Sequence, residues 1–448
     1  MMAAFWPRGS ACVTHCVVAA QSPPPVDSGV IVSGGRVLAC ADEGDAFYRR
    51  AADIVGAFLQ IKNLNVLIGA GASYALGSPR IRSVGMDEIH AMLERNGVEA
   101  SSEATAVVRL IVEREGGTVD LEQVLATLSS ALALAGSGGS VELSATSVTV
   151  VAVREARGAL NRALALDCDL PKADLPESHP LGAHRTFFRR LLRARRLDLP
   201  RVRIFTTNYD LAIEKALDAD GTVYFDGFSG TVERVFKPEM FERDLYLPPD
   251  PDQRRMLRVP DLLYLHKLHG SINWRKRQGT NLVAADEVIQ ESRASAAGDD
   301  ELILIFPTPL KEGDVLAYPY SVLFRTFMSA LAEPDAALIA IGYGFADDHI
   351  NRQLLQALGS PSFQLLAIGP SGVFTSCSRE REDVEIDYAD GPLGVLARAH
   401  DARITVISGS TAGRFEDFAV NVMPDSTEAG GDVPLETQAA LAESLESA

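Results

Sequence analysis

The sequence is poor in the residues that mark several classes of protein. Its five cysteines are too few and too scattered for a disulfide framework or paired zinc knuckles, and their odd number is typical of a reducing cytosol. No apolar run approaches the roughly 20 residues of a membrane helix. Basic residues are in the minority, because 42 lysines and arginines stand against 60 aspartates and glutamates, for a net charge of −18. We therefore expect a cytoplasmic protein whose surface as a whole binds neither membranes nor nucleic acids.

The remaining composition is that of an ordinary globular protein. Of the 448 residues, 47% are hydrophobic and 23% are charged, which predicts a sizeable core in one large domain with insertions, or in two domains. Prolines, scattered glycines and the absence of a sustained period predict an irregular extension over residues 1–45. The main domain is expected over 46–423, and an acidic, disordered tail without aromatic residues over 424–448.

Short apolar runs alternate with helix-length segments along the main domain. This alternation predicts an α/β fold with a Rossmann-like, doubly wound parallel sheet. The predicted strands are 64–68, 202–205, 262–265, 302–306, 337–341, 363–368 and 404–407. The predicted helices between them include 211–217, 320–331, 349–358 and 413–420.

The alternation is interrupted once, between the first and second predicted strands. Nearly all of this stretch has helical periodicity, which predicts a large helical insertion over about residues 86–200. The helices expected there are 86–95, 104–115, 119–134, 141–166 and 180–197. Strand pairing must resume beyond them, so we interpret the stretch as an insertion rather than a separate domain.

A glycine-rich turn, Gly69-Ala70-Gly71-Ala72-Ser73, directly follows the first predicted strand. Glycines let the backbone turn sharply and approach a phosphate, and the amides of a following helix stabilise the anion. The dehydrogenase fingerprint fails here, because Tyr74 occupies the position of its last glycine and Asp87 and Glu88 lie in a helical pattern rather than at a strand end. The structural alternative is a turn that only lets a strand pass into a helix.

Three further strand ends carry compact polar or glycine segments. Thr206-Thr207-Asn208-Tyr209-Asp210 closes the second strand, His269-Gly270-Ser271 the next, and Gly342-Tyr343-Gly344-Phe345 a later one. Open α/β sheets bind their ligands at the carboxyl ends of the strands. The sequence therefore predicts a ligand site at this edge of the sheet.

In this order the segments resemble the sirtuin family. The turn at 69–73 with Gly77-Ser78-Pro79-Arg80-Ile81-Arg82 is similar to the GAG-x-S and G-x-P-x-x-R signature, and 207–210 resembles the Q-N-[IVT]-D segment, with Thr207 in place of glutamine. His269-Gly270 resembles the segment with the catalytic histidine. Gly342-Tyr343-Gly344-Phe345-Ala346-Asp347 fits the pattern of bacterial sirtuin-like domains in anti-phage NADases.

The resemblance implies that NAD is bound and cleaved between ribose and nicotinamide. Because histidine titrates near neutrality, His269 suits a general base that acts on a ribose hydroxyl or on water. Asn208 would orient the water or the ribose, and Asp210 would fix the loop or the ribose.

The resemblance also assigns residues that hold NAD. Gly69, Ala70, Gly71 and Ser73 would cradle the diphosphate, and Arg82 would close a loop over it. The later turn would contact the dinucleotide through Gly342, Tyr343 and Gly344.

Other polar residues compete for these roles. His266 lies three positions before His269 in the same apolar run, and an odd spacing on a strand would place the two on opposite faces. We favour His269 because it abuts the glycine at the strand end. His349 could contact the ligand, or could cap or pack its helix, whereas Asp347 or Asp348 is expected to cap that helix.

The sequence departs from sirtuin deacylases in lacking the two C-x-x-C pairs of their zinc ribbon. Cys12 and Cys16 with His15 form only half of a site, outside the core. Without that module we expect no metal and water as the acceptor, hence NAD hydrolysis, with NAD as substrate. A silent NAD or ADP-ribose sensor, a zinc-free protein deacylase and an ADP-ribosyltransferase stay as alternatives.

An NADase must be restrained in its own cell, and the resemblance implies how. Family members act with sensors such as HerA-type ATPases or Argonaute-like proteins, so we expect a separate activating partner or a regulated homo-oligomer. Eight arginines make a basic strip, which is either a solvated helix face or a docking surface for an acidic partner or nucleic acid. They are Arg185, Arg189, Arg190, Arg193, Arg195, Arg196, Arg201 and Arg203.

Overall fold

A computed structural model describes most of the chain between residues 29 and 425. The described ranges are 29–40, 44–79, 81–135, 138–143, 145–171, 181–248, 257–277, 287–292, 302–304, 318–370, 374–380, 383–388 and 390–425. Contacts divide the chain into two compact units. The first comprises residues 1–72, 183–204 and 328–448, and the second comprises 73–182 and 205–327.

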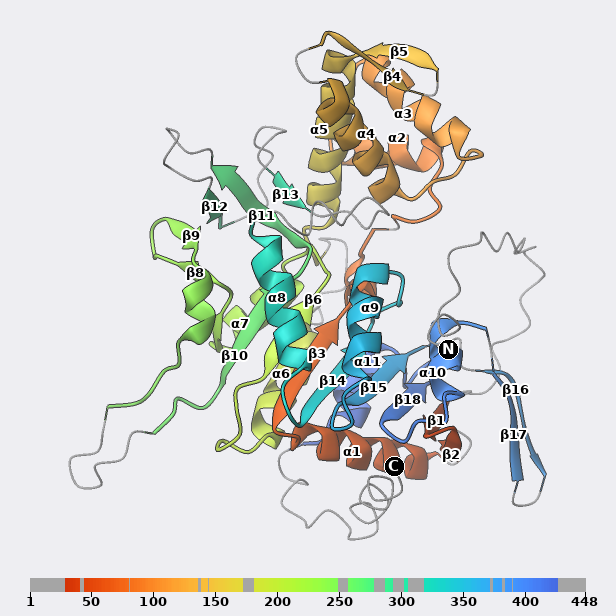
Figure 1. The fold of residues 1–448 in the computed structure, drawn as a ribbon, viewed down its shortest axis with the longest axis vertical. Coiled ribbons are helices and arrows are strands. Elements are labelled where there is room, and N and C mark those ends of the chain that lie inside the picture. Colours follow the sequence, from red (N-terminus) through yellow and green to blue (C-terminus); the bar gives the residue numbers. More distant parts are fainter. Residues whose placement is uncertain are drawn as a thin grey trace. The chain divides into compact units, whose positions relative to one another are not determined.

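The first unit is built on a mainly parallel sheet (Figure 1). The strand order is β2-β1-β18-β15-β14-β3, with the start of β6 beside β3. The strands are β1 Val30–Ser33, β2 Arg36–Cys40, β3 Asn63–Ile68, β6 Arg203–Thr206, β14 Ala336–Ile341, β15 Gln364–Gly369 and β18 Ile404–Ser408. Strands β3, β14, β15 and β18 are parallel neighbours, and every residue of β14 is buried, as expected of a strand covered on both faces.

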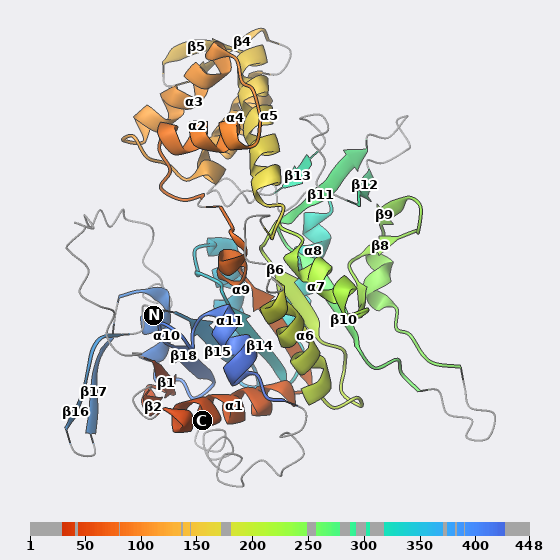
Figure 2. The ribbon, with the colours of Figure 1, turned by 180° about the vertical axis from the view of Figure 1, so that it is seen from behind.

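Helices cover both faces of this sheet, which confirms the predicted doubly wound α/β fold. Helix α9 lies on one face, and α6 and α11 lie on the other (Figures 1 and 2). The unit contains α1 Asp45–Leu59, α6 Gly182–Ala194, α9 Asp348–Ala357, α10 Pro392–Ala397 and α11 Phe415–Asp417, which continues into a π-helical turn, Phe418–Val422. A separate hairpin consists of β16 Phe374–Glu380 and β17 Asp383–Tyr388.

The N-terminal extension differs from the irregular segment expected over residues 1–45. Strands β1 and β2 form a hairpin, and β1 pairs antiparallel with β18, with Val30 opposite Ser408. The turn between them is Gly34-Gly35, and both glycines have positive φ (56° and 76°). An apolar run followed by two glycines is a hairpin signal, and the prolines earlier in the extension obscured it.

The second unit contains the helical insertion. Helices α2 Met86–Arg95, α3 Ser102–Arg114, α4 Leu121–Ala135 and α5 Val150–Asp167 share one hydrophobic core. Residues 140–149 are not helical as expected but form a hairpin, β4 Ser140–Leu143 and β5 Thr146–Thr149. The predicted insertion ends too late in the sequence, because α6 belongs to the first unit.

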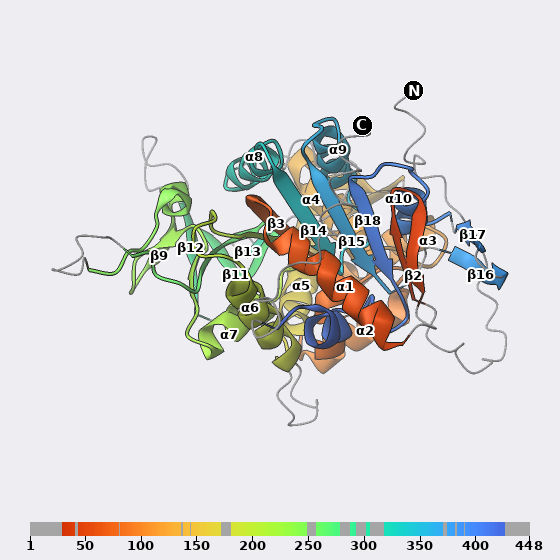
Figure 3. The same ribbon diagram turned by 90° about the horizontal axis from the view of Figure 1, so that it is seen from below.

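The second unit also contains the end of β6, the parallel pair β10–β7 and a five-stranded antiparallel sheet of order β13-β11-β12-β9-β8 (Figure 3). The predicted strand 302–306 is β13, of which the structure describes residues 302–304, and it pairs antiparallel with β11 instead of joining the parallel sheet. The elements are α7 Ala212–Ala219, β7 Val223–Phe225, β8 Phe228–Ser229, β9 Arg234–Phe236, a 3₁₀ helix Pro238–Glu242, β10 Leu262–Lys267, β11 Gly270–Arg277, β12 Glu287–Gln290, β13 Leu302–Leu304 and most of α8 Tyr320–Leu331.

Three arginines of the predicted basic strip make contacts inside the first unit. Arg195 is buried and donates to the carbonyls of Leu59, Ile61, Lys62 and Pro200 at 2.6–3.3 Å. Arg190 donates to the carbonyls of Ala419, Val420 and Met423, in and just after the π-helical turn Phe418–Val422. Arg203 forms a bidentate ion pair with Glu333. These three side chains are therefore neither part of a solvated helix face nor available as a docking surface.

Some of the predictions concern residues that the structure does not describe. The tail 426–448 and the Cys12–Cys16 segment lie outside the described residues. Among the described helices, none combines the length and the hydrophobicity that a membrane-spanning segment needs. In that same part, no group of three or more histidine, cysteine, aspartate or glutamate side chains could hold a metal ion.

Candidate functional site

The glycine turn of the first unit is where the ends of β3 and β14 meet. The Gly69 amide donates to the Ile341 carbonyl at 3.0 Å, and the Gly71 amide donates to the Gly342 carbonyl at 2.9 Å. A Cβ on Gly69 would lie 2.6 Å from the Gly342 oxygen, and one on Gly71 would lie 2.9 Å from the Gly342 Cα. Both glycines are therefore required by backbone packing, whatever else they do.

The same turn nevertheless exposes backbone to a ligand. Ala70 and Gly71 are exposed, and the chain continues directly into a 3₁₀ helix, Ala70–Leu76. Because the Gly71 amide already has an acceptor, a bound diphosphate would use other amides of the turn. Arg82 is exposed in the following loop, and Arg80 lies outside the described residues.

The glycine-aromatic turn after β14 is held by its own side chains. The Tyr343 hydroxyl donates to Asn351 Oδ1 at 3.0 Å, and Asn351 Nδ2 donates to the Phe345 carbonyl at 2.9 Å. Tyr343 is buried, so its contribution to a ligand site would come through the backbone it fixes. Gly344 is exposed, and a Cβ there would meet no atom within 4 Å. Asp347 occupies the N-cap position of α9, as predicted, but its side chain makes no capping hydrogen bond.

In the second unit, the structure brings together three of the predicted site residues. Asn208 Nδ2 donates to Ser73 Oγ at 3.1 Å, and Ser73 Oγ donates to Asp210 Oδ2 at 2.8 Å. The other Asp210 oxygen accepts the Ala212 amide at 2.9 Å, at the first residue of α7. Asp210 is thus a loop-fixing residue, which is one of the two roles expected for it. Ser73 belongs to this cluster, and its hydroxyl is used by Asp210.

Asn208 is held from its backbone as well as its side chain. Its amide donates to Thr206 Oγ1 at 3.0 Å, and the residue is only 6% exposed. Its Oδ1 atom is buried and has no hydrogen-bond partner among the described residues. A buried carbonyl oxygen without a donor costs free energy unless a ligand or water supplies one. Asn208 therefore offers a placed acceptor for a hydroxyl group or a water molecule.

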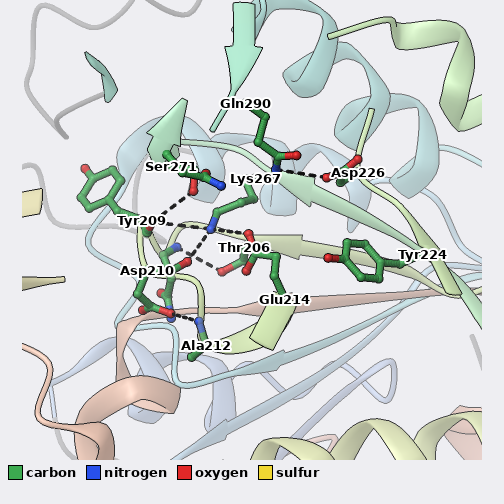
Figure 4. Close-up of polar contacts among 12 residues, drawn as sticks. Thr206, Tyr209, Asp210, Ala212, Glu214, Tyr224, Asp226, Lys267, Ser271 and Gln290 are labelled. Carbon is green, nitrogen blue, oxygen red and sulfur yellow. Dashed lines mark hydrogen bonds and ion pairs between the residues drawn. The ribbon is translucent and has the colours of Figure 1, made fainter. Parts of the chain in front are cut away.

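A buried lysine that sequence reasoning missed supports this loop from the end of β10. Lys267 Nζ donates to Glu214 Oε1 at 2.8 Å, to the Tyr209 carbonyl at 3.5 Å and to the Asp210 carbonyl (Figure 4). Burial raises the pKa of Glu214, and the positive charge of Lys267 opposes that shift. A lysine inside the apolar run 262–268 was the available signal, because lysines are rarely buried unless paired.

The two candidate histidines occupy different environments, for a reason other than strand alternation. Strand β10 ends at Lys267, so His269 lies in the turn before β11 and the odd spacing has no meaning there. His266 is packed between the rings of Phe205 and Phe241, with centroids 4.7 and 4.0 Å away. His269 is buried, and its ring centroid lies 6.3 Å from that of Tyr209. Tyr209 belongs to the loop that carries Asn208.

Asp87 and Glu88, the acidic residues near the spacing of the dehydrogenase fingerprint, are helical, as expected. Asp87 and Glu88 lie in the first turn of α2, and Glu88 accepts the Gly85 amide at 2.9 Å. They therefore stabilise a helix N-terminus and do not close a strand. His349 lies half-buried in the first turn of α9.

Comparison with known proteins shows a similarity over part of the chain. A model of the SIR2-like domain matches residues 202–386, a range that includes Asn208 and His269. No curated protein matches the chain. Among solved structures, it is similar to a complex of a mutant Sir2 homologue with 2'-O-acetyl ADP ribose, at 12% identity and a TM-score of 0.28, over 71% of this chain and 84% of that one.

Proposed function

We propose that the chain is an NAD glycohydrolase, which cleaves NAD into ADP-ribose and nicotinamide. The observation that carries the proposal is the Asn208 side chain, whose buried Oδ1 has no donor among the described residues while Ser73 holds its Nδ2. His269, packed beside the same loop, supplies an imidazole, the side chain that most often acts as a general base. The SIR2-like match supports chemistry on NAD.

In the proposed reaction, the bond between the ribose anomeric carbon and the nicotinamide nitrogen breaks, and its electron pair leaves with neutral nicotinamide. Because the bound nicotinamide is cationic, its departure needs no strong acid. Asn208 Oδ1 accepts a hydrogen bond from the attacking water or a ribose hydroxyl and so orients it. Water adds to the anomeric carbon, and His269 takes the proton that it loses.

The remaining assignments rest on the sequence resemblance. The exposed backbone at Ala70 and Gly71 is the candidate for the diphosphate, and Arg82 for a closing contact. Gly342 and Gly344 would approach the dinucleotide through their backbone, and no metal is needed.

The biological role belongs to the same proposal. Sirtuin-like NADases that deplete NAD during phage infection supply the model for this role. We propose an anti-phage effector that is restrained as a homo-oligomer or by a separate partner, such as a HerA-type ATPase or an Argonaute-like protein. Loss of cellular NAD on infection, in cells with the wild-type gene and not with a His269→Ala gene, is the matching measurement.

The central experiment measures nicotinamide release from NAD by the purified chain. We expect release by the wild type and a loss of about 100-fold or more in His269→Ala and in Asn208→Ala, since a positioned base contributes about 10²–10⁴-fold. His266→Phe is the matched control, because His266 packs between two aromatic rings, and it should retain turnover.

Three other outcomes would contradict the assignment in different ways. Binding of NAD without release, with and without candidate partners, would identify a silent sensor. Release that appears only when an acyl-lysine peptide is added would identify a deacylase. Equal loss in His266→Phe and His269→Ala would remove the basis for choosing His269.

A further inference from the structure

The side chain of Tyr209 leaves the catalytic loop and enters the helical insertion. Tyr209 lies between Asn208 and Asp210 in the sequence, yet it belongs to the hydrophobic cluster formed by helices α2 to α5. Figure 4 shows its ring pointing away from Lys267, toward which its carbonyl is turned. Tyr209 therefore joins the loop to the insertion within the second unit, beside Leu211 and Ile272, which belong to the same cluster.

A buried hydrogen bond anchors that side chain. The Tyr209 hydroxyl donates to Glu122 Oε1 at 2.9 Å, and both residues are 6% exposed. Glu122 lies in the first turn of α4, where the helix dipole stabilises a carboxylate. A buried hydrogen bond between two side chains that are themselves packed in the core holds the ring in one position.

The backbone carbonyl of Tyr209 accepts hydrogen bonds from the strands on either side of His269. The Tyr209 carbonyl accepts the Ile272 amide at 3.0 Å, Ser271 Oγ at 3.3 Å and Lys267 Nζ at 3.5 Å. Its ring centroid lies 6.3 Å from that of His269. Tyr209 is thus in contact with the insertion, with the turn that carries His269 and, through the chain, with Asn208.

We propose that Tyr209 is a positioning residue through which Glu122 of helix α4 holds Asn208 and His269 in the geometry for NAD cleavage. This inference rests on the proposed function. It makes the helical insertion part of the catalytic apparatus, because the loop has an anchor on a helix about 87 residues away in the sequence. Small displacements of such groups are costly, since about 1 Å reduces the rate by roughly 10²-fold.

The test compares Tyr209→Phe with Tyr224→Phe. Each removes one tyrosine hydroxyl that donates to a carboxylate, but Tyr224 donates to Asp218 at 3.1 Å, outside the catalytic loop. Tyr209→Phe should lower kcat by about 10- to 100-fold with little change in KM, because the ring still fills its place while the anchor is lost. Tyr224→Phe should retain the wild-type kcat.

Substitutions of Glu122 test the other partner of this hydrogen bond, alone and together with Tyr209→Phe. Glu122→Gln keeps an acceptor and should retain most of kcat, whereas Glu122→Ala should match Tyr209→Phe. The double variant, Tyr209→Phe with Glu122→Ala, should be no slower than the slower single variant, because both remove one interaction. Additive losses, or a normal kcat in Tyr209→Phe, would overturn the proposal.

A readout without NAD separates this proposal from the proposed function. Hydrogen exchange of the amides at 207–211 should be faster in Tyr209→Phe than in the wild type and in Tyr224→Phe. If the wild type releases no nicotinamide, the proposed function fails, and faster exchange still supports the anchor. Unchanged exchange in Tyr209→Phe would overturn the anchor whether or not the protein cleaves NAD.

Discussion

At the scale of single residues, neighbours in one short segment have separate tasks. Asn208 keeps a buried oxygen without a partner among the described residues, whereas both Asp210 oxygens accept hydrogen bonds inside the protein. Tyr209, between them, points to Glu122. The sequence pattern predicted the polar strand end but not this division, because hydrogen-bond partners are set by residues far along the chain.

Ser73 should matter through the cluster it completes. Ser73→Ala removes the hydroxyl that accepts from Asn208 and donates to Asp210. We expect kcat for nicotinamide release to fall by about tenfold, because the Asn208 amide loses the group that orients it.

The matched control for this variant is Ser129→Ala. It removes a side-chain bond to the Leu125 carbonyl on α4 and should leave kcat unchanged. A Ser73→Ala enzyme as fast as the control would show that Asn208 does not depend on this hydrogen bond.

At the scale of elements, Arg195, the residue that follows helix α6, stabilises the structure of the first unit. Arg195 caps carbonyls at the end of α1 and in the loop after it, and burial lowers the pKa of Arg195 to about 10. It therefore stays charged at neutral pH. The charge run was visible in the sequence, but a count of arginines cannot distinguish a buried cap from a solvated face.

Arg195→Met should destabilise the protein strongly. It leaves several buried carbonyls without donors, so the free energy of unfolding should fall by about 3 kcal/mol or more in a urea titration. Its neighbour Arg196 pairs with Asp198 at the surface, and Arg196→Met should leave the unfolding midpoint unchanged within error. Equal effects in the two variants would contradict the buried role of Arg195.

The glycine turn shows a second element-scale effect. Glycines at 69 and 71 were expected to admit a phosphate, and the structure adds that Gly342 approaches both of them. Two strand ends can meet this closely only without side chains. The motif therefore has a packing explanation in addition to the proposed one.

At the scale of the whole molecule, NAD binding should be separable from turnover. Because His269→Ala keeps the binding residues but removes the base, NAD should raise its melting temperature by a few degrees. A ligand at 100 times its Kd stabilises by about 2.7 kcal/mol.

In the wild type, that shift should fade as NAD is consumed, and a metal chelator should change neither result. The absence of any shift with NAD in His269→Ala would argue that the histidine is needed for binding rather than as a base.

The α/β class, the buried strands and the polar segments at their carboxyl ends can all be predicted from the sequence. These follow from local hydrophobic periodicity and from turn residues, which act over a few positions. Four features depend instead on long-range folding: residues 30–40 join the sheet, β13 pairs outside it, Lys267 supports the loop and Tyr209 reaches Glu122. Each of these depends on a partner distant in sequence, and such pairings are selected by packing and by the need to satisfy buried polar groups.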